Sequence, residues 1–170
     1  PDLHAEVEGP CPPLQSLEER FSALLESDLS RLAPDLQAPV WQAAGIARLC
    51  LADAGPAVAL HGDLHHDNIL QEADGSWRTI DAKGVIGCRG YEVANAFGNP
   101  LGLERVTRDP SYHAALAAHF ACVLDLPARR ILEWAVAHMA LALVWAAADG
   151  TAAVSEWNET LPVLLSALDG

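Results

Sequence analysis

The sequence carries very little positive charge. Its 170 residues include 10 lysines and arginines against 23 aspartates and glutamates, a formal net charge of −13. Lysine occurs only once, at Lys83. Nucleic acids and anionic membranes attract basic surfaces, so this composition argues against both as main partners. A cationic small molecule would suit it, because carboxylates can pair with positive groups.

Cysteine pairs are also lacking. The four cysteines, Cys11, Cys50, Cys88 and Cys122, are scattered and form no Cys-x-x-Cys. That spacing predicts neither a zinc site nor a dithiol redox motif, and reduced thiols are the ordinary state in the cytosol. The first residues show no basic-then-apolar signal pattern, so we expect a cytoplasmic protein.

No apolar run is long enough to be a convincing membrane span. The longest, residues 131–148, is interrupted by Glu133 and His138 and falls short of the roughly 20 residues that cross a bilayer. We expect a buried helix there and no membrane partner.

A dense group of polar residues lies near the middle of the chain. Residues 61–68 read His-Gly-Asp-Leu-His-His-Asp-Asn, and residues 80–81 read Ile-Asp. Phosphoryl transfer from ATP uses these side-chain types: a carboxylate orients the attacking hydroxyl, and an Asn and an Asp hold the metal ions that bridge the phosphates. Protein kinases space the first two as His-Arg-Asp-x-x-x-x-Asn, which is the spacing of Asp63 and Asn68. The pattern predicts a kinase-type catalytic loop, with Asp81 as the second metal ligand.

Short strands are predicted on both sides of this motif. An apolar run at 57–60 precedes it, another starts at residue 68, and residues 77–80 follow a turn-rich stretch. A hairpin of the last two strands would bring Asp81 beside Asn68, as a shared metal site requires. An Asp or Asn on a loop usually forms hydrogen bonds with its own backbone. The catalytic interpretation therefore depends on the complete spacing of Asp63, Asn68 and Asp81.

Residues 61–70 resemble the catalytic loop of aminoglycoside phosphotransferases and related small-molecule kinases. Ile-Asp-Ala-Lys-Gly-Val-Ile-Gly at 80–87 and Gly-Tyr-Glu-Val-Ala-Asn at 90–95 are similar to the streptomycin phosphotransferase and hydroxyurea-resistance kinase branch. The resemblance implies an antibiotic-resistance enzyme that uses ATP and Mg²⁺ to phosphorylate a hydroxyl of a small molecule, with a streptomycin-like aminoglycoside as the first choice of acceptor.

The resemblance also implies roles for individual residues. Asp63 would be the catalytic base, and Asn68 and Asp81 would bind Mg²⁺. Four further residues would support the phosphates or the loop: His61, His65, Lys83 and Glu92.

Among these supporting residues, His65 would approach the γ-phosphate, while His61 and Glu92 would brace the loop. The position of Glu92 also suits a helix start, where the helix dipole favours an acid. Lys83 could pair with a carboxylate of the site or brace the loop itself.

Most of the remaining chain has helical periodicity. Ser16 and Glu19 form a capping-box pattern that predicts a helix over residues 17–33, closed by Pro34. Pro39 is predicted to open a second helix to residue 54, with Trp41 on its buried face. Further helices are predicted over residues 91–97, 109–124, 127–149 and 151–168.

These elements predict a mainly α fold of the α+β class, a kinase-like C-terminal lobe whose short β-hairpins carry the catalytic loop and the metal-binding Asp. A complete kinase adds a lobe with a Gly-rich loop and a strand lysine. Neither is present, because Gly-x-Gly-x-x-Gly is missing and the single lysine follows the motif. We expect residues 16–170 to form the C-terminal lobe and residues 1–15 an irregular linker remnant. With the N-terminal nucleotide lobe absent, the chain alone should be nearly inactive.

Two other functions remain open at this point. Gly-Asp-Leu-His at 62–65 matches one block of binuclear metallophosphoesterases, whose metal sites use such side chains, although their later blocks are missing. A lobe that binds an acceptor or partner without transferring phosphate is the second alternative. The acceptor could be bound by any of several acidic or aromatic residues: Glu104, Asp109, Glu133, Trp134, Asp149, Glu156 and Trp157.

Overall fold

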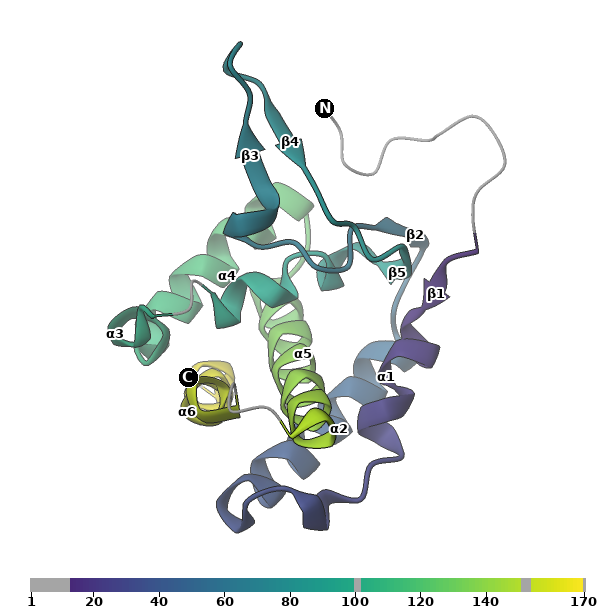
Figure 1. Cartoon of the computed structure of the whole chain (residues 1–170), viewed down its shortest axis with the longest axis vertical. Helices are drawn as coiled ribbons and strands as arrows, with labels where there is room; N and C mark the ends of the chain where they lie inside the picture. The colour runs from purple at the N-terminus through teal and green to yellow at the C-terminus, as the bar shows by residue number, and fades with distance from the viewer. Residues whose placement is uncertain (1–12, 100–101, 151–153, 170) are drawn as a thin grey trace.

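One long helix lies at the centre of the molecule (Figure 1). The computed structural model describes residues 13–99, 102–150 and 154–169. Every residue from 134 to 143 is buried. By length and composition this helix could cross a membrane, with a mean hydropathy of 1.7, but 72% of that stretch is buried inside the fold, as in a core helix. The central helix and its packing partners are α5 (Ala128–Asp149), α1 (Leu17–Leu25), α2 (Pro34–Ala52), α4 (Pro110–Leu124) and α6 (Val154–Asp169).

Two small sheets lie at one end of this helical body. The first has the order β1 (Gln15–Ser16), β5 (Val85–Cys88), β2 (Ala57–Leu60), with β1 parallel and β2 antiparallel to β5. The second is the hairpin of β3 (Ile69–Gln71) and β4 (Trp77–Thr79), which projects from the body (Figure 1). The structure thus confirms a mainly helical fold with short strands. The loop that carries the polar motif joins β2 to β3.

The first helix begins as predicted but ends early. The Ser16 hydroxyl accepts from the Glu19 amide at 3.1 Å, and the Glu19 carboxylate accepts from the Ser16 amide at 2.9 Å. The prediction of a helix to residue 33 was wrong, because α1 stops at Leu25. Ser27 donates to the Leu24 carbonyl and Asp28 accepts from a nearby amide, and such local bonds compete with helix formation.

The second helix starts earlier than predicted. Pro34 is its first residue rather than the end of the preceding helix, and Pro39 lies inside it. A proline is tolerated at a first helical position because its missing N–H has no intrahelical partner there. Trp41 was predicted to be buried but is 71% exposed. The buried face of α2 includes Val40, Ala43 and Ala47.

The remaining helices follow the Pro and Gly signals closely. Asp109 caps α4 by accepting from the Ser111 amide at 2.9 Å, and Gly150 ends α5 with a φ of 64°. Residues 91–97 form no α-helix; the chain makes two tighter 3₁₀ turns at Arg89–Tyr91 and Ala94–Gly98. α3 (Glu104–Thr107) was not predicted. The predicted start of the last helix at residue 151, and residues 1–12 of the predicted linker, lie outside the described residues, while residue 15 belongs to β1 rather than to an irregular segment.

Candidate active site

The loop after β2 is held at its start by a buried carboxylate. The backbone amides of His61 and Gly62 donate to the two carboxylate oxygens of Glu92, at 2.9 and 3.2 Å. Glu92 is only 2% exposed. Hydrogen bonds from amides to a carboxylate are charge-assisted and stronger than hydrogen bonds between neutral groups. Glu92 lies between the two 3₁₀ turns rather than at the start of an α-helix. From there it anchors the loop.

Gly62 occupies a position that a larger residue would not fit. Its φ is +78°, and a Cβ there would lie 2.5 Å from Cγ2 of the buried Val85. The Gly62 carbonyl accepts from Arg20 Nη2 at 3.1 Å. The loop is consequently packed tightly between β5 and a side chain of α1.

Asp63 follows this anchor and is half-buried. Its Oδ1 accepts a hydrogen bond from Asn95 Nδ2 at 2.6 Å, and its Oδ2 lies 3.7 Å from Lys83 Nζ. One carboxylate oxygen is thus fixed by an amide, while the other faces a cation. Asn95 belongs to the stretch at residues 90–95 that carried the resemblance, but no role for it was inferred from sequence.

The β3–β4 hairpin brings Asp81 next to Asn68, as its turn-rich sequence predicted. The Ile80 amide donates to the Asn68 carbonyl at 3.0 Å, directly beyond the paired residues Ile69 and Thr79. Asp81 is the next residue along the chain. The side-chain amide of Asn68 donates to the Asp63 carbonyl at 2.9 Å, which leaves its oxygen available as a ligand.

Lys83 connects the two carboxylates of the site. Its Nζ lies 2.6 Å from an Asp81 oxygen and 3.7 Å from Asp63. The hydrogen bond and charge of Lys83 lower the pKa of Asp81, and the same hydrogen bond raises the pKa of Lys83. Asp81 has a φ of +60°, a conformation uncommon for a residue with a side chain and found at functional sites. The Lys83 side chain thus pairs with the carboxylates of the site.

His61 joins the loop to the end of β4. Its Nε2 donates to the Ile80 carbonyl at 2.8 Å, and its own carbonyl accepts from the Lys83 amide at 2.8 Å. These two bonds tie the segment that carries Asp63 to the segment that carries Asp81. His61 is thus placed to brace the loop rather than to contact a substrate.

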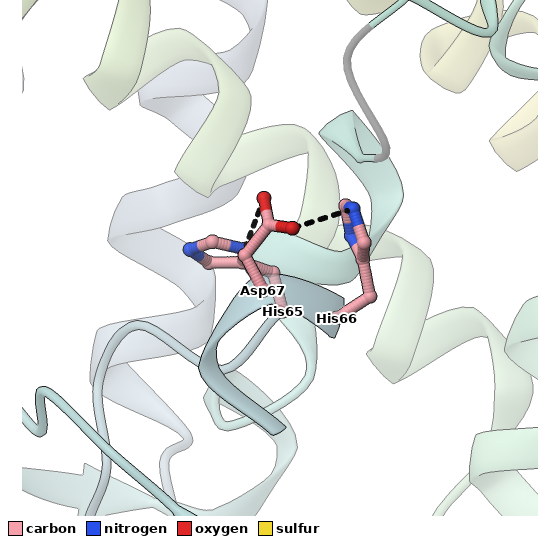
Figure 2. Close-up of side chains that lie close together, drawn as sticks. All are labelled: His65, His66 and Asp67. Atoms are coloured by element: carbon pink, nitrogen blue, oxygen red, sulfur yellow. Dashed lines mark ion pairs between the residues drawn. The ribbon is translucent and has the colours of Figure 1, made fainter. Parts of the chain in front are cut away.

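His65, His66 and Asp67 form a small cluster on the outer side of the loop. Figure 2 shows the Asp67 carboxylate between the two imidazole rings, 3.8 Å from His65 Nδ1 and 3.2 Å from His66 Nε2. The three could each offer one ligand atom within 4.8 Å of the others. His65 Nε2 also accepts a hydrogen bond from the Asn68 side-chain amide at 3.2 Å. His65 is therefore connected to Asn68 as well as to this cluster.

A cavity of about 400 Å³ opens beside Asp63. Three carboxylates line it, those of Asp63, Asp67 and Asp149, together with the rings of Trp145 and Trp157. The other residues that line the cavity are Arg20, His65, Asn95, Asn99, His138, Ala142 and Ala146.

Of the five proposed acceptor-binding residues whose side chains are described, two line this cavity, Asp149 and Trp157. Trp134 is in the core, Asp109 caps α4, and Glu133 pairs with two arginines of its own helix. The side chains of Glu104 and Glu156 lie outside the described part of the chain. Trp145 and His138 were missed because their spacing in α5 is that of ordinary core residues.

The donor set suits Mg²⁺. Magnesium prefers oxygen ligands and binds through one or two carboxylates plus substrate phosphates. The Asn68 amide oxygen and the Asp81 carboxylate offer such ligands on adjoining segments of one hairpin, and Asp81 is exposed on that hairpin. The histidines of the neighbouring cluster suit transition metals better.

Comparisons with known proteins found a matching family model and two curated relatives. The family model described as "Aminoglycoside/hydroxyurea antibiotic resistance kinase" matches residues 2–150. A protein named streptomycin 3''-kinase from Klebsiella pneumoniae is 35% identical over 158 residues, covering 87% of this chain and 54% of that protein. A streptomycin 6-kinase from Streptomyces griseus is 28% identical over 156 residues, covering 86% of this chain and 49% of that protein. This chain therefore spans about half the length of these curated relatives. No solved structure gives a significant match.

Proposed function

We propose a function from one premise: the chain belongs to the family of aminoglycoside/hydroxyurea antibiotic resistance kinases. On that premise it is the catalytic half of a phosphotransferase that moves the γ-phosphoryl group of ATP to a hydroxyl of a small molecule. The observation that carries the proposal is the placement of Asp63. Its carboxylate is fixed by Asn95, faces Lys83, and opens on the same cavity as two other acids.

The proposed mechanism assigns the chemistry to this loop and hairpin. Asp63 orients the acceptor hydroxyl and takes its proton as phosphate transfer proceeds, with its free oxygen directed by the Asn95 bond. Asn68 and Asp81 would hold Mg²⁺, which when bound neutralises charge on the phosphates. Lys83 offsets the negative charge of the Asp63 and Asp81 carboxylates before substrates bind. Glu92 and His61 keep these groups in register, and such positioning supplies most of the catalysis in phosphoryl transfer.

The fold is proposed to be a kinase-like C-terminal lobe that works with a nucleotide-binding lobe. The chain matches only about half of each relative, and its single lysine is already engaged at Asp81. A strand lysine and a Gly-rich loop for the ATP phosphates would come from the other half. The phosphoesterase alternative has no support, since the described residues after 103 are helical and the matching family consists of kinases.

The proposed acceptor is a cationic aminoglycoside of the streptomycin type. Both curated relatives are named as streptomycin kinases. In this chain, Asp67 and Asp149 could pair with guanidinium or ammonium groups, and the rings of Trp145 and Trp157 could stack on them. A net charge of −13 favours approach of such a cation.

The test is ATP turnover with streptomycin, measured for this chain alone and for a protein in which it follows a nucleotide-binding lobe. We expect phosphorylated streptomycin only from the second. Asp63→Asn should lower that turnover by about 10²–10⁴-fold, the usual worth of a general base, while Asp35→Asn, at an exposed site on α2, should leave it unchanged. Streptomycin binding without phosphate transfer by the two-lobed protein would refute the proposal and favour a lobe that only binds.

A further inference from the structure

A buried chain of hydrogen bonds runs from α1 to α5 beneath the cavity. Arg20 Nε donates to the Tyr91 hydroxyl at 2.9 Å, and that hydroxyl lies 2.9 Å from His138 Nδ1. Tyr91 is 2% exposed and His138 5% exposed. Arg20 is held in place by its bond to the Gly62 carbonyl and by stacking 4.9 Å from the centre of the Trp145 ring.

The direction of this chain is determined by its first member. A guanidinium group can only donate hydrogen bonds, so the Tyr91 oxygen is the acceptor and its own proton is free for the next partner. Burial raises the pKa of Tyr91 to about 12, so that proton stays on the hydroxyl near neutral pH. Tyr91 therefore donates to His138, and His138 Nδ1 is the acceptor.

The tautomer of His138 follows. Burial, and then the charge of Arg20, lower the pKa of His138 to about 3, so the ring is neutral. A neutral imidazole carries one N–H and one lone pair. Since the lone pair is used at Nδ1, the proton is on Nε2.

That N–H has no partner within the protein as described. No residue among 13–99, 102–150 and 154–169 accepts from His138 Nε2, and the ring forms part of the wall of the cavity that contains Asp63. The Nε2 atom is not closed off inside the protein, so this donor faces the cavity and is open to an acceptor there. An oxygen atom of a molecule in the cavity would satisfy it.

We propose that His138 donates a hydrogen bond from its Nε2–H to an oxygen of the acceptor. His138 is then a specificity-determining residue of the acceptor pocket. Arg20 and Tyr91 are positioning residues that keep this donor on Nε2. The inference rests on the proposed function, because it takes the cavity beside Asp63 as the acceptor site. A neutral donor selects a hydroxyl or ether oxygen without repelling the positive groups of the same molecule, as an imidazolium would.

The first test reads the tautomer in the 170-residue chain labelled with ¹⁵N-histidine. We expect the nitrogen shifts of His138 to report a protonated Nε2, and Tyr91→Phe to give a mixture of tautomers because the donor to Nδ1 is gone. A proton on Nδ1 in the unsubstituted chain would overturn the inference.

The second test measures streptomycin binding by calorimetry, without ATP. His138→Asn keeps an acceptor near the Tyr91 hydroxyl but removes the donor at the cavity, and should weaken binding by about twofold to twelvefold, the usual worth of one hydrogen bond. His138→Gln, whose amide N–H reaches the place of Nε2, should recover part of the loss. His113 is the matched control: it is buried in α4, and its Nε2 donates to the Thr107 carbonyl at 2.8 Å. His113→Asn should leave streptomycin affinity unchanged.

The outcomes separate this inference from the proposed function. Equal binding by His138→Asn and the unsubstituted chain, with phosphate transfer intact in the two-lobed protein, would overturn the role of His138 alone. Absence of both streptomycin binding and phosphate transfer would overturn the function and the inference together. Weakened binding by His138→Asn, recovery by His138→Gln and a protonated Nε2 would support the inference.

Discussion

Replacing Gly62 with alanine should cost more stability than the same replacement at Gly75. Both glycines have a positive φ, +78° and +85°. At Gly75 a Cβ would meet nothing within 4 Å, whereas at Gly62 it would lie 2.5 Å from Val85 Cγ2. The pair therefore separates the cost of the backbone conformation from the cost of the contact.

The expected magnitudes follow from these two terms. The left-handed conformation costs a residue with a Cβ about 1–2 kcal/mol, which should be the whole effect of Gly75→Ala. Overpacking adds about 1–3 kcal/mol, so Gly62→Ala should lower the free energy of unfolding by about 2–5 kcal/mol. Val85 is fully buried in β5 and has little room to move away.

Urea unfolding of the variants provides the assay, with Val85→Ala added to complete a double-mutant cycle. Val85→Ala removes Cγ2, so the Gly62→Ala/Val85→Ala protein should be more stable than the sum of the single effects predicts, by about 1 kcal/mol or more. Equal losses for Gly62→Ala and Gly75→Ala would refute the reasoning, as would strict additivity in the cycle.

Three further predictions concern the buried carboxylate, the lysine bridge and the buried histidine. Glu92→Gln should lower the free energy of unfolding by about 1–3 kcal/mol and speed hydrogen exchange of the two amides that it binds; unchanged exchange would contradict the anchoring role. Lys83→Met should raise the pKa of Asp81 toward 3.8, seen by NMR titration of its carboxyl carbon, and an unmoved titration would show that Lys83 is not the cause. His138 has a pKa of about 3 when folded against 6.5 as a free side chain, so below pH 6.5 the unfolded chain binds a proton that the folded chain does not, and stability falls with pH until about pH 3. Acid unfolding of His138→Asn should show a slope smaller by about one proton, and an identical slope would argue against a neutral buried ring.

Local signals in the sequence predicted the helix ends that depend on neighbouring residues. The capping box of Ser16 and Glu19, the cap at Asp109 and the stop at Gly150 all occur where they were expected. Each of these uses bonds between residues a few positions apart, so their geometry is available to a reader of the sequence.

Periodicity was less informative where a helix could turn either of two faces inward. Trp41 fits the apolar stripe of α2 but is exposed, and α1 ends at Leu25 although apolar residues continue to Leu32. A stripe shows that one face of a helix is apolar; the direction of that face is determined by the neighbouring helix. Here that neighbour is α5, which is more than 75 residues away in the chain.

The spacing of Asp63, Asn68 and Asp81 was enough to predict a kinase-type loop and hairpin, because the turn between β3 and β4 is local. The sequence by itself therefore determined the family and most helix ends, and the roles of Asp63, Asn68 and Asp81 stay a prediction. The tertiary structure alone decided that Asn95 would bond Asp63, and that the Arg20, Tyr91 and His138 side chains would join beneath the cavity beside Asp63. These contacts link residues 32 to 71 positions apart. They arise only when α1, the 3₁₀ turns and α5 pack together, since no local period encodes which distant side chains will meet.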